Sequence, residues 1–160
     1  MPKHKVAIIS DTHDKLRPEI EAYLRECEAI FHAGDVTSSE IKSRLESIAP
    51  LYLVRGNNDF GWAMSIPYTL QTEYAGFKFV MAHMEKDIPY PIPETDFVIF
   101  GHTHNYYVER EDGHTWLNPG SCGPMRFGSG ITMAILTLDS DKHTFSIEKI
   151  DLTNSIKNPW

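Results

Sequence analysis

The chain has 160 residues, of which 41% are hydrophobic and 23% charged, a composition typical of a globular protein with a core of ordinary size. We expect a single domain over residues 1–160. The net charge of −7 argues against nucleic acid as a stable partner and against an anionic membrane surface, because both bind clustered Lys and Arg. No apolar stretch approaches the roughly 18 residues of a membrane span. No leader peptide opens the chain, and the only cysteines are Cys27 and Cys122, so we expect a cytoplasmic protein with free thiols.

The first third of the chain alternates between strand and helix patterns. Apolar runs predict strands over 6–10, 29–33 and 51–54. Between them, Pro18 begins a predicted helix over 18–26, and Ser38 or Ser39 caps a second one over 38–47. This order predicts parallel strands with helices packed outside the sheet.

The rest of the chain is typical of hairpins. Ala75-Gly76, Asp112-Gly113 and Ser140-Asp141 each separate two strand patterns. The strands predicted for this part are 69–74, 78–83, 106–111, 114–118, 131–139 and 144–151. Residues 84–95 contain three prolines and are predicted as an extended loop rather than a helix. We therefore expect an α/β protein in which two packed sheets carry helices on the outside.

Residues that bind divalent metals stand at the ends of these apolar runs. The candidate ligands are Asp11, His13, Asp35, Asn57, His83, His102 and His104. Since ligands of open α/β sheets gather beyond the carboxyl ends of the strands, we expect these side chains to converge. Oxygen and imidazole ligands without a thiolate are typical of a Mn, Fe or Zn centre rather than of a structural zinc site with cysteine ligands. The number of candidates suits two ions that share one carboxylate, and Asp35 can bridge them through its two oxygens.

Each motif taken alone is a weak signal, and other polar residues have a simpler interpretation. Histidines outside the motifs are expected to be packed or hydrogen-bonded: His4, His32, His114 and His143. Asp14 and Asp59 are expected in turns, as caps, or as hydrogen-bond acceptors that support ligands. Arg55 and Arg126 are expected in surface salt bridges, with contact to a phosphate as the alternative. The terminal Trp160 either docks or ends a free tail.

The whole series resembles the calcineurin-like metallophosphoesterase superfamily. The motifs that carry the resemblance are Asp11-x-His13, Gly34-Asp35, Gly56-Asn57-x-Asp59, His83 and Gly101-His102-x-His104. The chain length and Asn118-Pro119-Gly120-Ser121 resemble the small bacterial and archaeal phosphodiesterase branch, and the resemblance spans roughly residues 5 to 150. It implies a four-layer α/β/β/α sandwich of two mixed sheets flanked by helices.

The resemblance also implies roles for individual residues. The first of two divalent ions is expected on Asp11, His13, Asp35 and His104, and the second on Asp35, Asn57, His83 and His102. Mn is the preferred metal, with Fe, Ni or Zn as alternatives. A hydroxide shared by the ions is expected to attack phosphorus in line with the leaving alcohol of a small phosphate ester, most simply a phosphodiester. The residues expected to take part directly are Asp35, Asn57, Asn58 and His102.

Three departures from the family pattern bear on the substrate. Asn58 stands where larger relatives have a histidine, and an amide cannot act as a general acid, so alkyl monoesters are expected to be poor substrates. The usual His-Gly-His reads His83-Met84-Glu85, and the proline-rich loop 84–95 replaces a helix. The substrate cleft is therefore expected to differ from that of the relatives.

Two other functions stay open. One is a non-catalytic scaffold of the same fold, as in a eukaryotic membrane-trafficking protein with an eroded metal site; the full ligand set here favours an enzyme. The other is a protein phosphatase, which the chain length and Asn58 disfavour. A homo-oligomer is also open, since aromatics such as Trp62, Tyr106 and Tyr107 could line a contact between copies or the cleft itself.

Overall fold

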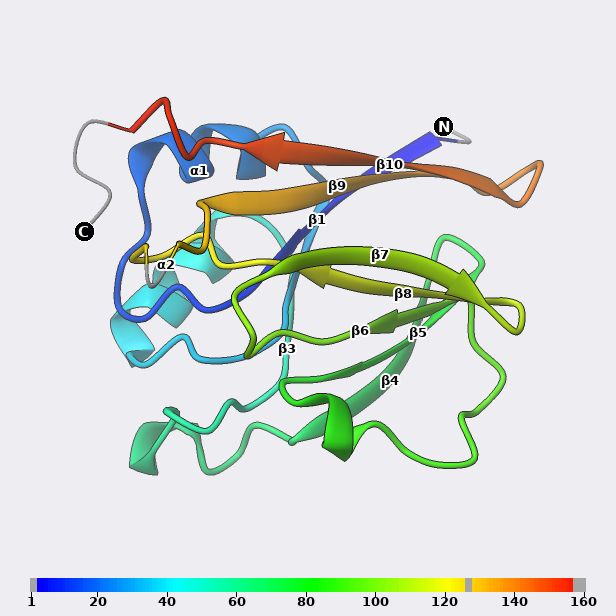
Figure 1. Ribbon diagram of the computed structural model, residues 1–160, viewed down its shortest axis with the longest axis horizontal. Helices are drawn as coiled ribbons and strands as arrows, with labels where there is room; N and C mark the ends of the chain where they lie inside the picture. The colour runs from blue at the N-terminus through cyan, green and yellow to red at the C-terminus, as the bar shows by residue number, and fades with distance from the viewer. Residues whose placement is uncertain (1–2, 126–127, 157–160) are drawn as a thin grey trace.

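The computed structural model describes residues 3–125 and 128–156 (Figure 1). Arg126 and Trp160 lie outside the described residues, so the expectations for these two side chains stay predictions. Within the described part, no helix is both long enough and apolar enough to cross a membrane.

The first sheet combines the parallel strands of the N-terminal part with the C-terminal hairpin. Its order is β10-β9-β1-β2-β3, with β1, β2 and β3 parallel and β9 antiparallel to β1. The strands are β1 (Lys3–Ile9), β2 (Ala29–His32), β3 (Leu51–Leu53), β9 (Thr132–Asp139) and β10 (Thr144–Asp151). The predicted strand, helix, strand, helix, strand order is thereby confirmed.

Two helices cover the outer face of this sheet. α1 (Pro18–Leu24) begins at its proline, and α2 (Ser39–Ile48) is capped by Ser38, whose hydroxyl accepts a hydrogen bond from the backbone N–H of Ile41. Ile20 and Leu24 of α1 and Ile41 and Leu45 of α2 are buried against the sheet. The apolar spacing that predicted the helices is therefore also what fastens them to the sheet.

The second sheet is mixed and is built mainly from hairpins. Its order is β4-β5-β6-β8-β7, with β5, β6 and β8 parallel and both edge strands antiparallel to their neighbours. The strands are β4 (Thr69–Tyr74), β5 (Phe77–Ala82), β6 (Phe97–Ile99), β7 (Tyr106–Glu111) and β8 (His114–Pro119). Ala75-Gly76 and Asp112-Gly113 form the predicted tight turns, and all four residues have positive φ, as a two-residue hairpin of this hand requires.

Alternating side chains of the strands separate three buried clusters. Ala7 and Ile9 face the helices, whereas Val6 and Ile8 face the second sheet. Between the sheets, aromatic rings stack, with Phe31 and Phe79 centroids 4.6 Å apart. The confirmed fold is a sandwich of two mixed sheets.

The outer face of the second sheet is covered by a loop. Val80 and Val98 point outward and pack with Ile88 and Ile92 of the proline-rich segment 84–95. That segment holds one turn of 3-10 helix, η2 (Glu85–Asp87), and is otherwise irregular, as its prolines predicted. A second short turn, η1 (Gly61–Ala63), follows β3.

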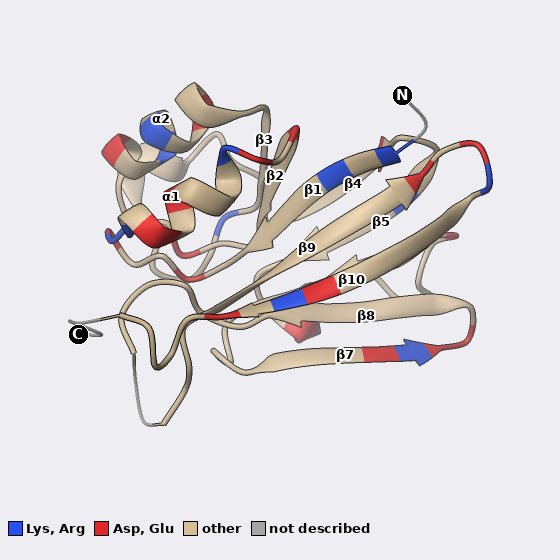
Figure 2. Cartoon of the chain, turned by 90° about the horizontal axis from the view of Figure 1, so that it is seen from above, with Lys and Arg blue, Asp and Glu red and all other residues tan. Residues whose placement is uncertain are grey.

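Charged residues are mixed in sign over the elements. Figure 2 shows Lys and Arg interspersed with Asp and Glu on the helices, on the strands and in the hairpin loops, without a continuous basic stripe over the part of the chain that is drawn in colour. The expectation that nucleic acid is not a stable partner stays a prediction.

Candidate metal centre

The candidate ligands lie where strands of both sheets end. Asp11 and Asp35 follow β1 and β2 of the first sheet, and His83 follows β5 of the second. All three are buried, with Asp35 1% and His83 2% exposed. Because the sheets pack face to face with these strand ends at one side, residues more than 70 positions apart become neighbours.

The ligand-bearing turns have an unusual backbone. Asp11, His13, Asp35, His102 and His104 all have positive φ, between 46° and 71°. This left-handed conformation is uncommon for residues other than glycine, and it gathers at functional sites. Each strand thus ends abruptly, and the turn aims its polar side chain across the end of the sheet.

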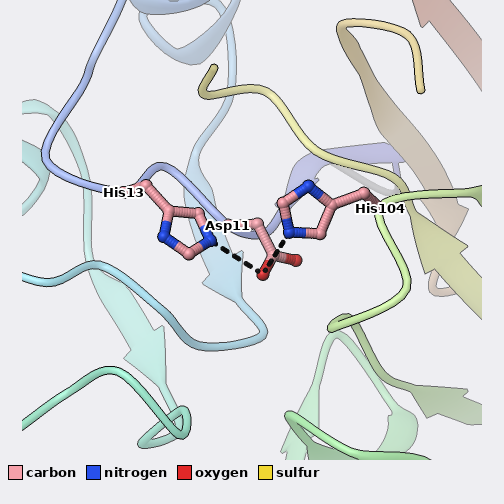
Figure 3. A group of neighbouring side chains, drawn as sticks. All are labelled: Asp11, His13 and His104. Carbon is pink, nitrogen blue, oxygen red and sulfur yellow. Dashed lines mark ion pairs between the residues drawn. The ribbon is translucent and has the colours of Figure 1, made fainter. Parts of the chain in front are cut away.

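One compact group contains Asp11, His13 and His104 (Figure 3). The Nε2 atoms of His13 and His104 lie 3.5 Å and 3.3 Å from the same oxygen, Oδ1 of Asp11. The two imidazole rings have their centroids 5.3 Å apart. The carboxylate and both rings therefore converge on one small volume.

A second compact group shares Asp11 and adds Asp35 and His83. Nε2 of His83 lies 3.3 Å from Oδ2 of Asp35 and 3.8 Å from Oδ1 of Asp11. The same Oδ2 of Asp35 lies 3.5 Å from Nε2 of His13. Asp35 thus lies beside a histidine of each group, while Asp11 belongs to both groups. The bridging role of Asp35 stays a prediction.

The chemistry of the converging atoms fits divalent cations. Oδ1 of Asp11, Nε2 of His13 and Nε2 of His83 are buried and have no hydrogen-bond partner among the described residues. A buried polar atom without a partner is costly, and cations bound by the two groups would satisfy all three. Oxygen and imidazole donors suit Mn, Fe, Ni or Zn.

Neighbouring groups orient the free ligand atoms. Oδ2 of Asp11 accepts hydrogen bonds from the hydroxyl of Ser10 (2.7 Å) and the backbone N–H of His102 (3.1 Å), which leaves Oδ1 facing the histidines. Nδ1 of His83 donates to the carbonyl of Ala33 at 2.8 Å. In the neutral ring the proton is therefore on Nδ1, and Nε2, which faces the carboxylates, has a free lone pair.

The electrostatics of the group favour charged carboxylates. Burial would raise the pKa of Asp11, but the close approach of His104 and His13 and the charge of His83 hold it well below its usual range. Burial would likewise raise the pKa of Asp35, yet His83 and Asn58 lower it overall. For His83, burial would lower the pKa, but Asp35 and Asp11 raise it overall. The carboxylates therefore remain ionised and available to cations.

The match to a known family agrees with this geometry. Residues 5–141 match the model of the calcineurin-like phosphoesterase superfamily domain. The chain belongs to this superfamily.

Relatives of this chain are found by sequence and by structure. A probable metallophosphoesterase of Methanothermobacter thermautotrophicus is 32% identical over 154 residues, covering 86% of this chain and 87% of the relative. The solved structure of an archaeal phosphodiesterase has a TM-score of 0.72 at 27% identity, covering 91% of this chain and 99% of that one. Vacuolar Protein Sorting 29 of Cryptosporidium parvum has a TM-score of 0.73 at 18% identity, covering 95% and 99%, and this likeness shows the fold alone.

Two predicted ligands lie at the rim of the centre. His102 is exposed, and its ring centroid is 5.2 Å from that of His83. Asn57 is exposed at the turn that follows β3. His102 belongs to neither compact group of carboxylates and imidazoles among the described residues. The ligand roles of His102 and Asn57 stay predictions.

Asn58 contacts a ligand. Its backbone N–H donates to Oδ1 of Asp35 at 2.8 Å, and its side-chain Nδ2 donates to Oδ2 of the same carboxylate at 2.9 Å. The residue that replaces the family histidine therefore holds Asp35, while a direct part in the reaction stays a prediction.

Some supporting residues were not predicted from the sequence. Ser10 binds Asp11 directly, and the hydroxyl of Ser121 donates to the carbonyl of Asp11 at 3.1 Å. Nδ2 of Asn118 donates to the carbonyl of Gly101 and to the hydroxyl of Thr103. The Asn118-Pro119-Gly120-Ser121 segment, used above only as a sign of the family branch, thus fixes the turns that carry Asp11 and His102.

The simpler interpretations of the remaining histidines are confirmed. The fully buried His32 accepts a hydrogen bond from the backbone N–H of Gly34 at Nδ1, and its Nε2 lies 3.1 Å from the hydroxyl of Thr12. His4 pairs with Glu28, His114 bonds to the carbonyl of Thr95, and His143 stacks on Phe77.

Arg55 differs from its expectation. Its Nε donates to the carbonyl of Asp59 at 2.8 Å, and its guanidinium lies over the ring of Tyr68, 5.1 Å from the centroid. Among the described residues, Arg55 is therefore held by the loop that follows β3 rather than by a surface salt bridge.

Proposed function

We propose that this calcineurin-like phosphoesterase is a metal-dependent phosphodiesterase with a dinuclear centre. The observation that carries the proposal is the set of buried, unpartnered donor atoms on Asp11, His13 and His83, which face one another across the ends of two sheets. Asp11, His13, Asp35 and His104 would hold one cation. Asp35, Asn57, His83 and His102 would hold the other.

Each part of the centre has a separate task in this proposal. When bound, the two cations would activate a water for in-line attack on phosphorus and offset the charge of the phosphoryl oxygens. Asp35, placed between His13 and His83, would keep the cation sites at a set spacing. His102 and Asn57, at the exposed rim, would complete the second site on the side from which substrate arrives.

The ester class follows from what stands beside the centre. Asn58 donates its backbone N–H and its side-chain NH2 to Asp35, and it has no acidic proton to give to a leaving alkoxide. Esters with a good leaving group are therefore the better substrates. A phosphodiester fits this and agrees with the archaeal phosphodiesterase among the similar structures. We propose Mn as the metal, with Fe, Ni or Zn as alternatives.

A non-catalytic scaffold is the second candidate. It requires only the fold, which this chain shares with Vacuolar Protein Sorting 29 at a TM-score of 0.73. The convergence of Asp11, His13, Asp35, His83 and His104 favours the enzyme, because a binding surface has no need of buried, unpartnered ligand atoms.

A metal panel tests the proposal. Metal-free protein is loaded with Mn, Fe, Ni or Zn, and both bound metal and hydrolysis of bis-p-nitrophenyl phosphate are measured. We expect close to two ions per chain and hydrolysis with at least one metal. Asp35→Ala and His104→Ala should abolish hydrolysis, while His143→Ala, at an exposed site on the surface, should leave it unchanged. A wild-type protein that binds metal but hydrolyses nothing with any of the four would favour the scaffold.

A further inference from the structure

A buried carboxylate outside the ligand set joins two of the metal-bearing turns. Asp59 is 2% exposed, and its carboxylate accepts three backbone hydrogen bonds. Oδ2 accepts from the N–H of Asp35 at 2.9 Å and of Gly56 at 2.8 Å, and Oδ1 accepts from the N–H of Thr37 at 2.7 Å. One side chain thus ties the turn after β2 to the turn after β3.

The tie is reciprocal. The carboxylate of Asp35 accepts from the backbone and side-chain N–H groups of Asn58, as described above. Each aspartate therefore binds the backbone of the other's turn. We name this arrangement of Asp35, Asn58 and Asp59 the carboxylate clasp.

The clasp also determines where Asn57 stands. Asp59 donates its backbone N–H to the carbonyl of Gly56 at 3.2 Å, so residues 56–59 form a tight turn with Asn57 near its apex. Both flanking residues, Gly56 and Asn58, are bound within the clasp. Asn57 itself is exposed, so its direction depends on the turn and not on packing.

The turn after β2 needs such support because its backbone is strained. Asp35 and Thr37 have φ of 62° and 71°, and a β-branched residue rarely adopts this region. The N–H groups that Asp59 accepts are those of these two residues. Without the Asp59 carboxylate as acceptor, this strained conformation of the turn is less stable, and the Asp35 carboxylate is expected to move with the turn.

From these contacts we infer that Asp59 is a positioning residue for the second cation. The inference rests on the proposed function, in which Asp35 and Asn57 are two of the four ligands of that ion. In that proposal Asp35 serves both ions, but Asn57, which the clasp also places, serves only the second. The other ligands of the first ion, Asp11, His13 and His104, follow β1 and β6 and are not bound by the clasp. Loss of Asp59 should therefore weaken the second ion more than the first.

The test variant is Asp59→Asn, which keeps the shape of the side chain. An amide has one acceptor oxygen, so it can serve either the shared N–H groups of Asp35 and Gly56 or that of Thr37, and its NH2 then faces a donor. Residues that orient metal ligands change metal affinity by about tenfold to a hundredfold when they are altered. We expect a loss of at least about tenfold for the second ion and a smaller change for the first.

The matched control is Asp139→Asn. Oδ1 of Asp139 also accepts two backbone N–H groups, from Asp141 and Lys142, but in the β9–β10 hairpin. This variant removes the same kind of turn support away from the ligands. It is expected to lower the melting temperature while leaving both metal affinities unchanged.

Calorimetric titration of metal-free protein with Mn and with Zn measures both affinities, and the melting temperature is recorded on each metal-free variant. Asn58→Ala is measured in parallel, because it removes the side-chain hydrogen bond of the clasp to Asp35. Asn58 is only partly buried, so this variant is expected to fold even where Asp59→Asn does not. We expect it to weaken the second ion several-fold. If wild-type protein binds two ions and a folded Asp59→Asn or Asn58→Ala binds them equally well, the inference is overturned. A wild-type protein that binds fewer than two ions contradicts the proposed dinuclear centre itself.

Discussion

At the scale of single residues, the centre depends on positions where the backbone comes unusually close to a ligand. A Cβ at Gly56 would lie 2.2 Å from Oδ1 of Asp35 and 2.4 Å from its backbone nitrogen. A Cβ at Gly101 would lie 2.1 Å from the hydroxyl of Ser10. At these two positions only glycine fits, because there is no room for a Cβ beside the ligands.

Gly56→Ala should destroy the metal centre. The added methyl group cannot fit beside Asp35 without moving the backbone of that residue, so we expect at least about a hundredfold loss of metal affinity and of activity. Titration calorimetry and the phosphodiester assay measure both losses. Gly61→Ala is the control, because a Cβ there meets no described heavy atom within 4 Å. Equal affinities in the two variants would contradict this account of the site.

His32 should make the metal-free protein sensitive to mild acid. Burial lowers the pKa of His32 from 6.5 to about 4. Between these values the unfolded chain binds a proton that the folded protein does not, so stability falls as the pH is lowered, by up to about 3 kcal/mol. Urea unfolding in the presence of a chelator, at several pH values from about 7 to about 4, measures the loss.

His32→Gln supplies the comparison for this pH series. The variant has no group that titrates in this interval at position 32, so its stability should change less steeply with pH. If the free energy of unfolding of the variant falls as steeply with pH as that of the wild type, groups other than His32 cause the acid sensitivity.

At the scale of elements, the segment 84–95 takes the place of an outer layer over the second sheet. Ile88 is 2% exposed and packs in a cluster with Val80, Val98 and Trp116. The prolines exclude a regular helix there, yet the outward-facing side chains of β5 and β6 still need a cover. A loop of apolar and proline residues provides it.

Ile88→Ala should destabilise the protein by about 2–4 kcal/mol, because it leaves a cavity under the loop. Ile92→Ala, at a position that is only partly buried, should cost clearly less. Chemical unfolding of both variants gives the two values. Equal costs would mean that the loop does not act as a packed layer.

At the scale of the whole molecule, the centre lies on the seam between two separately built sheets. Asp11 and Asp35 belong to the first sheet and His83 and His104 to the loops of the second. Cations held by all four would connect the sheets, which also meet through apolar packing and through the hydrogen bonds of His83 with Ala33 and of His102 with Asp11.

Metal should therefore stabilise the entire fold. At a free metal concentration a hundred times the dissociation constant, one site adds about 2.7 kcal/mol. Scanning calorimetry with Mn and with a chelator should show a single transition that moves to higher temperature with metal. Asp35→Ala should lose most of that shift. Metal binding without any change in the melting temperature would contradict a site that joins the sheets.

Several expectations about the whole protein stay predictions: a single domain over residues 1–160, a cytoplasmic location, a small phosphate-ester substrate and the oligomeric state. Tyr107 is 42% exposed, so one of the aromatics considered for a contact between copies is accessible. Light scattering of the purified protein measures the oligomeric state directly.

Much of the fold and of the site could be predicted because local signals agreed. Apolar runs that end in Asp or His predicted where the ligands stand along the chain, and Ala75-Gly76 and Asp112-Gly113 predicted the turns. The contacts of Asp59 could be anticipated only as a general acceptor role, because nothing in the local sequence indicates which N–H groups it meets. The hydrogen bonds of Ser10 and Ser121 to Asp11 could not be predicted from the sequence, since serine is common at strand ends and in loops.

The sequence by itself determined the order of strands and helices, the hairpins and the chemical nature of the ligands, because these follow from residue type and spacing within about ten positions. The tertiary structure alone decided which oxygen of Asp11 faces the histidines, that Asn58 and Asp59 bind the turn of Asp35, and that a loop covers the second sheet. The contacts of Asp35 with Asn58 and Asp59, and that of Asp11 with His102, join residues 23 to 91 positions apart. Their geometry depends on left-handed backbone angles and on the packing of two sheets, which no short-range pattern records.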